Sequence, residues 1–411
     1  MTTAPNIEPR KSVPDAEIVG QAGRRIASID FVRGLAMVFM ALDHTRDFFC
    51  NIPFEPEDIE HTWTFYFLVR WVTHFCAPAF FLLAGVGAYL YGAKHSTAAL
   101  QRFLAIRGLW LVLLEFTVIG FAWTFHLGWG MFGVICCLGL SMILLAAMVR
   151  VPRYLTMAIA LLVIATHDLF DSLKPASFHA MQWLLLVLHR SGRANLGDFS
   201  LFVLFPLIPW CAVTLLGFSM GNLFEHESRQ SRRILLAVGL GAMALFLLLR
   251  VTNLYGNPSA AIAHSTPGDW HPEPTISKSL ILWLDVEKYP PSLQYLLMTL
   301  GPILVLLATI AQFWGAVGRV LETFGRVPLF FYILHLYLIH LMAILIGWLM
   351  HQPVGWLFHG GFFLNYPPDG YGHGIGFVCA VWAAAIVLLY WPCAWFANVK
   401  RARPRSLLRF L

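Results

Sequence analysis

The chain has 411 residues, of which 58% are hydrophobic and only 12% are charged. Soluble domains carry about 25% charged residues, so this composition excludes an ordinary soluble protein and indicates a polytopic membrane protein. The formal net charge of +6 does not indicate nucleic-acid binding, because the basic residues occupy short loops and chain ends rather than one cluster. We therefore expect a lipid bilayer, and no nucleic acid, among the partners.

The first 25 residues are polar and lack the apolar core and small-residue cleavage site of a signal peptide. We expect residues 1–25 to be a cytoplasmic tail, 26–397 a transmembrane domain and 398–411 a basic cytoplasmic tail. The seven cysteines fall mostly in apolar segments and form no CxxC pair, which is typical of small core side chains. The sequence predicts neither a disulfide framework nor a metal site.

Apolar runs of roughly 20 residues, long enough to cross a bilayer, recur along the chain. Together they predict an all-α bundle of about ten transmembrane helices. The predicted spans are 29–50, 73–93, 108–124, 130–148, 154–170, 200–223, 234–251, 292–313, 328–350 and 374–396. The apolar stretch 181–189 is too short to span and suits the membrane interface.

The basic residues support this arrangement. With the N-terminus inside, 19 of the 28 lysines and arginines fall on inside segments, as the positive-inside rule requires. These residues are Arg10, Lys11, Arg24, Arg25, Lys94, Arg102, Arg107, Arg150, Arg153, Arg229, Arg232, Arg233, Arg319, Arg326, Lys400, Arg401, Arg403, Arg405 and Arg409. We therefore expect both termini in the cytoplasm and the long connections outside, where a substrate would be recognised.

The first predicted span carries an unusual number of ionisable residues. A charge at mid-bilayer costs about 2.5–3.5 kcal/mol on the insertion scale, so such residues are functional candidates by default. They are Asp30, Arg33, Asp43, His44, Arg46 and Asp47. The alternative is a purely structural role. Asp30 and Arg33 would then form an ion pair at the inner end of the helix, and the other four residues would lie at the outer membrane interface.

Eleven residues separate Arg33 from His44. Eleven steps return an α-helix to nearly the same face after a rise of roughly 16 Å. Arg33 thus lies nearer the cytoplasm and His44 nearer the outside on one stripe, with Asp30 spaced to pair with Arg33. Asp47, three residues beyond His44, or the adjacent Asp43, could orient the imidazole.

This stripe suits a phosphate-bearing donor. Histidine is the usual base for an alcohol or amine, and an arginine binds phosphates by charge and bidentate geometry. A long flexible donor such as acyl-coenzyme A fits the separation between Arg33 and His44, although the spacing alone does not require it.

Three segments carry a family resemblance: SIDFVRGLAMVFMALDHTRDFF (28–49), RWVTHFCAPAFFLLAGVGAYL (70–90) and GRVPLFFYILHLYLIHL (325–341). They resemble the bacterial branch of the heparan-alpha-glucosaminide N-acetyltransferase catalytic-domain family. The resemblance implies an integral-membrane enzyme of the bacterial inner membrane. It would move an acetyl or short acyl group from cytoplasmic acetyl-CoA to an extracytoplasmic acceptor, a sugar amine or hydroxyl on a glycan or small molecule.

The spacing Arg33-x10-His44 is also similar to the motif of acyltransferase family 3. In that related family the arginine is linked to the acyl donor and the histidine to catalysis. The animal enzymes instead place their catalytic histidine in the first lumenal loop, where this chain has His61. His74, at the start of the second predicted span, is the third candidate. The preferred order is His44, His74, His61.

The late segment 325–341 adds Tyr332 and His335 as candidates for the donor site. His335 suits a donor-site or helix-packing hydrogen bond. Glu115 in the third predicted span needs a partner, which Arg33 or another basic group could supply. His335 and His340 are five residues apart, which does not favour a shared metal.

Two alternative functions, other than an enzyme, stay open. A proton-coupled transporter of a small solute would also place ionisable residues in its first helix, although no inverted repeat is evident. A membrane scaffold without chemistry would tolerate alanine at these positions. The acceptor, the acyl length, the choice between direct transfer and an acyl-histidine, and assembly as a homodimer are left open by the sequence.

Overall fold

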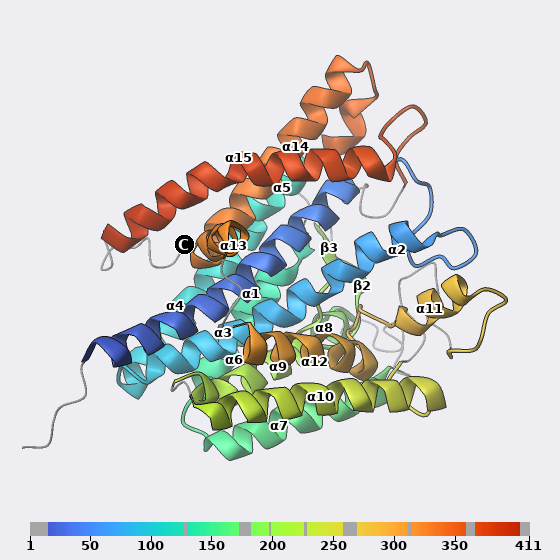
Figure 1. Cartoon of the computed structure of the whole chain (residues 1–411). Coiled ribbons are helices and arrows are strands. Elements are labelled where there is room, and N and C mark those ends of the chain that lie inside the picture. Colours follow the sequence, from blue (N-terminus) through green and yellow to red (C-terminus); the bar gives the residue numbers. More distant parts are fainter. Residues whose placement is uncertain are drawn as a thin grey trace, which may run out of the picture.

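A computed structural model describes residues 15–126, 130–171, 182–196, 199–225, 228–257, 269–310, 315–358 and 366–402, with side-chain environments from residue 27. These residues form one bundle of helices with a small three-stranded sheet (Figure 1). The predicted all-α membrane fold is confirmed. The domain boundaries predicted at residues 25 and 397 fall inside two continuous helices, Asp15–Phe49 and Ile375–Ala402, and stay predictions.

Some consecutive helices are joined directly by a helical turn, and others are separated by longer segments such as residues 50–63. The α-helices are α1 Asp15–Phe49, α2 Thr64–Trp71, α3 Cys76–Gly92, α4 Thr97–Leu114, α5 Gly120–Thr124, α6 Val134–Met148, α7 Arg153–Thr166, α8 Gln182–Leu188, α9 Leu207–Met220, α10 Arg229–Thr252, α11 Ile276–Leu284, α12 Leu293–Thr309, α13 Ala316–Arg326, α14 Pro328–Leu349 and α15 Ile375–Ala402. The tight turns are η1 Val72–Phe75, η3 His167–Phe170, η5 Gly221–Phe224 and η6 Val354–Phe358, with a π-helical turn, η2, at Glu115–Ile119.

Among the described residues, seven helical segments are long and apolar enough to cross a membrane. They are Thr64–Gly92, Thr97–Thr124, Arg153–Phe170, Leu207–Phe224, Arg229–Thr252, Pro328–Leu349 and Ile375–Ala402. The other three predicted spans coincide with α1, whose apolar run is interrupted by charges, and with the shorter apolar helices α6 and α12. The total of ten spans stays a prediction.

Side chains at the helix ends explain several boundaries. Ser96, Ser228 and Ser292 cap α4, α10 and α12, each accepting a hydrogen bond from the backbone N–H three residues later. Such caps satisfy donors that have no partner inside the helix. Pro328 occupies the first turn of α14, where its missing N–H costs nothing.

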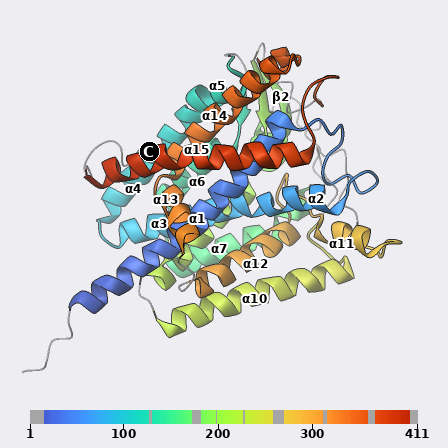
Figure 2. The same cartoon turned by 45° about the horizontal axis from the view of Figure 1, so that its top comes forward.

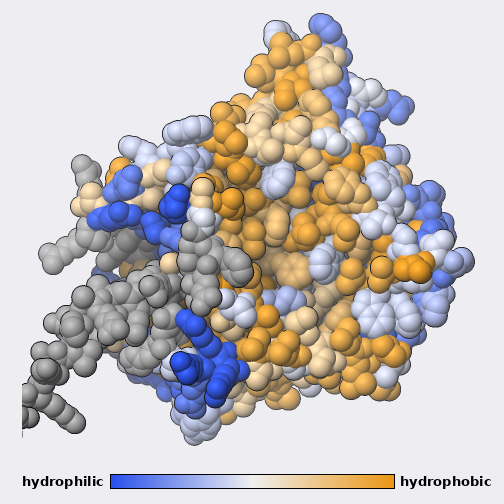
Figure 3. Space-filling view, viewed as in Figure 1, coloured by the Kyte–Doolittle hydropathy of each residue, from blue (hydrophilic) through white to orange (hydrophobic). Residues whose placement is uncertain are grey.

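The first residue of α1 and the last residue of α15 both lie at the left of Figure 1, and we call this end of the bundle the termini end. The opposite end carries residues 50–63 and α11, and we call it the loop end. Figure 3 shows an apolar surface between polar patches at the two ends, as expected for a protein surrounded by lipid. Figure 2 shows the same arrangement after a rotation.

The sheet corrects two predicted boundaries. β1 (Gly130–Phe132) pairs in parallel with β3 (Phe199–Val203), which pairs antiparallel with β2 (Gly192–Leu196). The spans predicted at 130–148 and 200–223 therefore begin as strands, and the helices start at Val134 and Leu207. Aromatic and β-branched residues suit paired strands as well as apolar helices, so hydropathy alone could not separate them.

Helix α1 lies near the centre of the bundle and packs against α3, α13, α14 and α15 (Figures 1 and 2). Its closest approach is to α13, at a pair of glycines. A Cβ added at Gly34 would lie 1.8 Å from the Leu321 carbonyl oxygen, and one at Gly325 would lie 1.8 Å from that of Asp30. Small residues at both contact points therefore let the two backbones touch.

We expect Gly34→Ala to destabilise the protein by about 1–3 kcal/mol, because the new methyl group would overlap backbone rather than a movable side chain. The measurement is the thermal midpoint of purified protein in nanodiscs, followed by tryptophan fluorescence. Gly241→Ala in α10 is the matched control, since its Cβ would meet nothing within 4 Å. Equal midpoints for the two variants would contradict the close α1–α13 contact.

Candidate functional site

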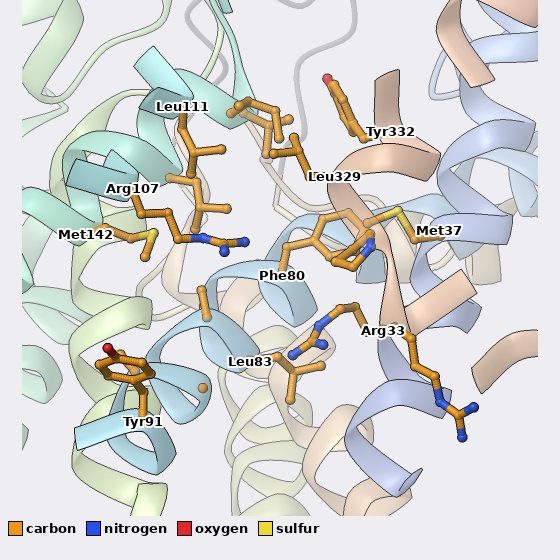
Figure 4. A pocket seen from close by; sticks show the side chains of 18 of the residues that line it. Arg33, Met37, Phe80, Leu83, Tyr91, Arg107, Leu111, Met142, Leu329 and Tyr332 are labelled. Atoms are coloured by element: carbon orange, nitrogen blue, oxygen red, sulfur yellow. The ribbon is translucent and has the colours of Figure 1, made fainter. Parts of the chain in front are cut away.

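A cavity of about 310 Å³ opens between α1, α3, α4, α6 and α14. Most of its lining is apolar, including Met37 of α1, Phe80 of α3 and Leu329 of α14. Figure 4 shows Tyr332 at one end of this cavity and Tyr91 near the other. The cavity thus has the proportions of a site for an elongated ligand that is partly apolar.

Four basic side chains line the cavity: Arg33, Arg107, Arg326 and Lys400. They come from α1, α4, α13 and α15, so the tertiary structure brings together residues from most of the chain. The nearby carboxylates of Asp30 and Glu322 pair with members of this group. Four cations against two carboxylates leave a positive excess, which favours an anionic ligand.

Arg33 is held in place from two directions. Its Nη1 donates to Asp30 Oδ1 at 3.2 Å and to the Gly325 carbonyl at 3.1 Å. The predicted Asp30–Arg33 ion pair is therefore confirmed. Asp30 also faces Arg326, with 3.8 Å between Oδ2 and Nε, so one carboxylate positions two of the cavity's cations.

His44 and His335 form a hydrogen-bonded pair beside the cavity. His44 Nδ1 lies 2.7 Å from His335 Nε2, and His335 Nδ1 lies 3.0 Å from the Phe331 carbonyl oxygen. A carbonyl only accepts, so the neutral His335 ring carries its proton on Nδ1 and accepts at Nε2. His44 must then donate from Nδ1, which leaves its Nε2 as an unprotonated base.

The sequence expectation for the partner of His44 is wrong. Asp47 pairs with Arg46 at 2.8 Å, and Asp43 pairs with Arg70 at 2.5 Å and with Arg46 at 3.3 Å. His44 instead hydrogen-bonds to a side chain 291 residues away in sequence. Two arginines compete successfully for the carboxylates, because a charged pair is stronger than a bond to a neutral imidazole.

Tyr332 connects the cavity with this histidine pair. It lines the cavity, and its ring meets the His44 ring edge-on, with centroids 6.3 Å apart. Trp123 packs edge-on against His44 as well, at 4.8 Å. The cavity therefore ends one aromatic ring away from His44, while Arg33 lies on its lining.

The other two candidate histidines lie elsewhere. His74 is 1% exposed, and its Nε2 lies 3.6 Å from Glu57 Oε1, while Arg70 donates to the same carboxylate at 2.9 Å. Burial raises the pKa of Glu57, but the Arg70 guanidinium and His74 outweigh it and hold that pKa well below its ordinary value. His61 is on the exposed surface and pairs with Asp58 at 2.8 Å. Its side chain is 60% exposed.

Glu115 caps a neighbouring helix rather than pairing with Arg33. Its Oε2 accepts a hydrogen bond from the backbone N–H of Cys136, in the first turn of α6, at 2.8 Å. A carboxylate at a helix N-terminus satisfies free donors and the helix dipole. This is a structural role that the isolated third span could not reveal.

Sequence reasoning missed Arg107, Arg326 and Lys400 as site residues. It counted them only as evidence for the inside of the membrane. The available signal was their position at the inner ends of predicted spans, next to long apolar runs. Their convergence on Arg33 depends on the tertiary structure.

The comparisons with known proteins concern the family of the chain. The family described as "Heparan-alpha-glucosaminide N-acetyltransferase, catalytic" matches residues 25–262, more than half of the chain. No curated protein matches the sequence. The matched segment contains Arg33, Arg107 and His44, whereas Tyr332 and His335 follow it. The chain belongs to the heparan-alpha-glucosaminide N-acetyltransferase catalytic-domain family, a family of membrane acetyltransferases.

Proposed function

We propose that the protein transfers an acetyl or short acyl group from acetyl-CoA, bound in the cavity, to an amine or hydroxyl acceptor at His44. One observation carries this proposal: the cavity lined by four cations is also lined by Tyr332, whose ring packs against His44, a histidine with an unprotonated Nε2. Membership of the family supports the acetyl group and the enzyme class.

The donor fits the cavity by its chemistry. Its phosphates would lie against Arg33, Arg107, Arg326 and Lys400, where guanidinium groups offer charge and paired donors. The less polar arm would pass along the apolar lining toward Tyr332. The thioester would then reach the end of the cavity nearest His44.

His44 is the proposed base. Its Nε2 takes the proton from the acceptor as the acceptor's nitrogen or oxygen attacks the thioester carbon. The C–S bond then breaks, and the leaving sulfur takes up the proton, giving the acetylated acceptor and free coenzyme A. His335 holds the tautomer that this step needs. The same unprotonated Nε2 would serve as the nucleophile if an acyl-histidine forms first.

The acceptor would approach from the loop end. Its class, a glycan or small molecule with a sugar amine or hydroxyl, rests on the family resemblance. Exposed Trp63 lies at this end and offers an aromatic face of the kind that stacks on sugar rings. The pattern of basic residues supports a cytoplasmic termini end, and we place the protein in a bacterial inner membrane.

The test uses purified full-length protein in nanodiscs. We expect saturable binding of acetyl-CoA by calorimetry, and release of the coenzyme A thiol when glucosamine or another amine-bearing sugar is added. Absence of binding at millimolar acetyl-CoA would reject the proposal. Solute uptake into proteoliposomes without any acyl donor would instead favour the hypothesis that the protein is a transporter.

We expect His335→Leu to lower kcat by about 10²-fold or more, because His44 loses the acceptor that fixes its tautomer. His335→Gln is the matched variant, since its amide oxygen can still accept the proton of His44 Nδ1, and it should retain more activity. The measurement is kcat and the acetyl-CoA KM for both variants, with thermal midpoints as a folding control. Equal kcat values for the two folded variants would contradict the orienting role.

A further inference from the structure

The hydroxyl of Tyr332 lacks the kind of partner that neighbouring tyrosines have. Tyr337, on the same helix, donates to the Val118 carbonyl at 2.9 Å, and Tyr371 donates to the Phe48 carbonyl at 2.7 Å. Tyr332 is only 2% exposed and lines the cavity, yet its hydroxyl makes no hydrogen bond to any residue that the structure describes. Among the described residues, this oxygen is not one of the fully enclosed polar atoms without a partner, so it keeps access to open space, and a ligand in the cavity can accept its hydrogen bond.

The position of Tyr332 matters because this residue touches both parts of the proposed site. It lines the cavity, and its ring packs edge-on against the His44 ring, with centroids 6.3 Å apart. A thioester that enters along the cavity and reacts beside His44 must bring its carbonyl group past Tyr332. Figure 4 shows Tyr332 above Leu329 at the end of the cavity away from Tyr91.

A second source of hydrogen-bond donors near this end is already occupied. Val134 and Ile135, at the start of α6, line the cavity, and helix N-termini commonly bind anionic groups. Here the carboxylate of Glu115 takes the Cys136 N–H in that first turn. The Tyr332 hydroxyl is therefore better placed than the N-terminus of α6 to donate a hydrogen bond to the thioester carbonyl oxygen.

We propose that the Tyr332 hydroxyl donates a hydrogen bond to the thioester carbonyl oxygen and stabilises the negative charge that develops on it. This inference rests on the proposed function and adds a catalytic residue to it. Attack on the carbonyl carbon forms the new C–N or C–O bond and moves the C=O π pair onto oxygen. Tyr332 keeps its own proton throughout. When that pair returns, the C–S bond breaks, sulfur leaves with the bonding pair, and the proton held by His44 neutralises it.

The test is Tyr332→Phe, which removes one oxygen and keeps the ring. Loss of one oxyanion donor lowers kcat by about 10²–10³-fold, while acetyl-CoA should bind within about threefold of wild type. Tyr337→Phe is the matched control on the same helix, because its hydroxyl bonds to backbone outside the cavity. It should leave kcat within about twofold of wild type.

A spectroscopic readout separates this role from a structural one. Acetyl-CoA labelled with ¹³C at the carbonyl should show a lower stretching frequency when bound to wild type than in water. That shift should disappear in Tyr332→Phe. An unshifted carbonyl in wild type would overturn the inference even if the variant fails to fold.

The outcomes also separate this inference from the proposed function. If wild type binds no acetyl-CoA, the proposed function fails and the inference fails with it. If wild type binds and reacts in a manner that depends on His44, but Tyr332→Phe keeps a normal kcat, only the assignment of Tyr332 is overturned. A loss explained wholly by weaker donor binding would overturn it too.

Discussion

His44→Ala is expected to lower the rate of acetyl transfer by about 10²–10⁴-fold, the usual contribution of a positioned general base. Binding of acetyl-CoA should stay near wild type, because the cations that would hold the donor line the cavity and His44 does not. The measurement is coenzyme A thiol release at saturating donor and acceptor, beside donor binding by calorimetry.

The other histidines supply the controls for this prediction. His61→Ala should change the rate by less than about threefold, because that side chain is 60% exposed and pairs with Asp58. His74→Ala removes a buried ring beside Glu57, so its first effect should be on thermal stability. Turnover that survived His44→Ala but not His74→Ala, at equal stability, would move the catalytic assignment to His74.

Arg33→Gln is expected to weaken acetyl-CoA binding by about 10–100-fold, because a hydrogen bond to a charged group is worth about 1.5–3 kcal/mol. The rate at saturating donor should change little, since Arg33 lies on the cavity lining while the reaction is assigned to His44. The measurement is the acetyl-CoA Kd by calorimetry at two salt concentrations. Wild type should lose affinity with salt more steeply than the variant.

The chain offers two comparisons for Arg33. Lys400→Gln removes a second cation of the cavity and should also raise the Kd, whereas Arg102→Gln should not, because Arg102 is exposed and does not line the cavity. Coenzyme A lacking its 3′-phosphate tests which phosphate each side chain meets. A Kd for Arg33→Gln equal to that for Arg102→Gln would contradict the donor site.

Hydropathy predicted the membrane fold well because an apolar run long enough to span a bilayer has few alternatives to a helix. All ten predicted spans coincide at least in part with helices. The errors lie at boundaries such as 200–206, where Phe199–Val203 forms a strand before Pro206 precedes α9. There the same apolar residues suit both structures, and pairing with Gly130–Phe132 decides between them.

The sequence by itself determined what depends on short-range geometry. The 3.6-residue period placed Arg33 and His44 on one stripe of α1, and the three-residue spacing predicted the Asp30–Arg33 pair that the structure contains. The distribution of lysine and arginine indicated which ends of the helices gather positive charge. These features depend only on residues close to one another along a single helix, so they can be predicted without knowing how the helices pack.

Only the tertiary structure decided which helices supply the rest of the site. His335 replaced Asp47 as the partner of His44, and Arg326 and Lys400 joined Arg33 at the cavity, across separations of about 300 residues or more. Such contacts depend on how whole helices pack, for example on the backbone approach at Gly34 and Gly325. Helical periodicity fixes the direction of a side chain around its own axis, and packing fixes what that side chain meets.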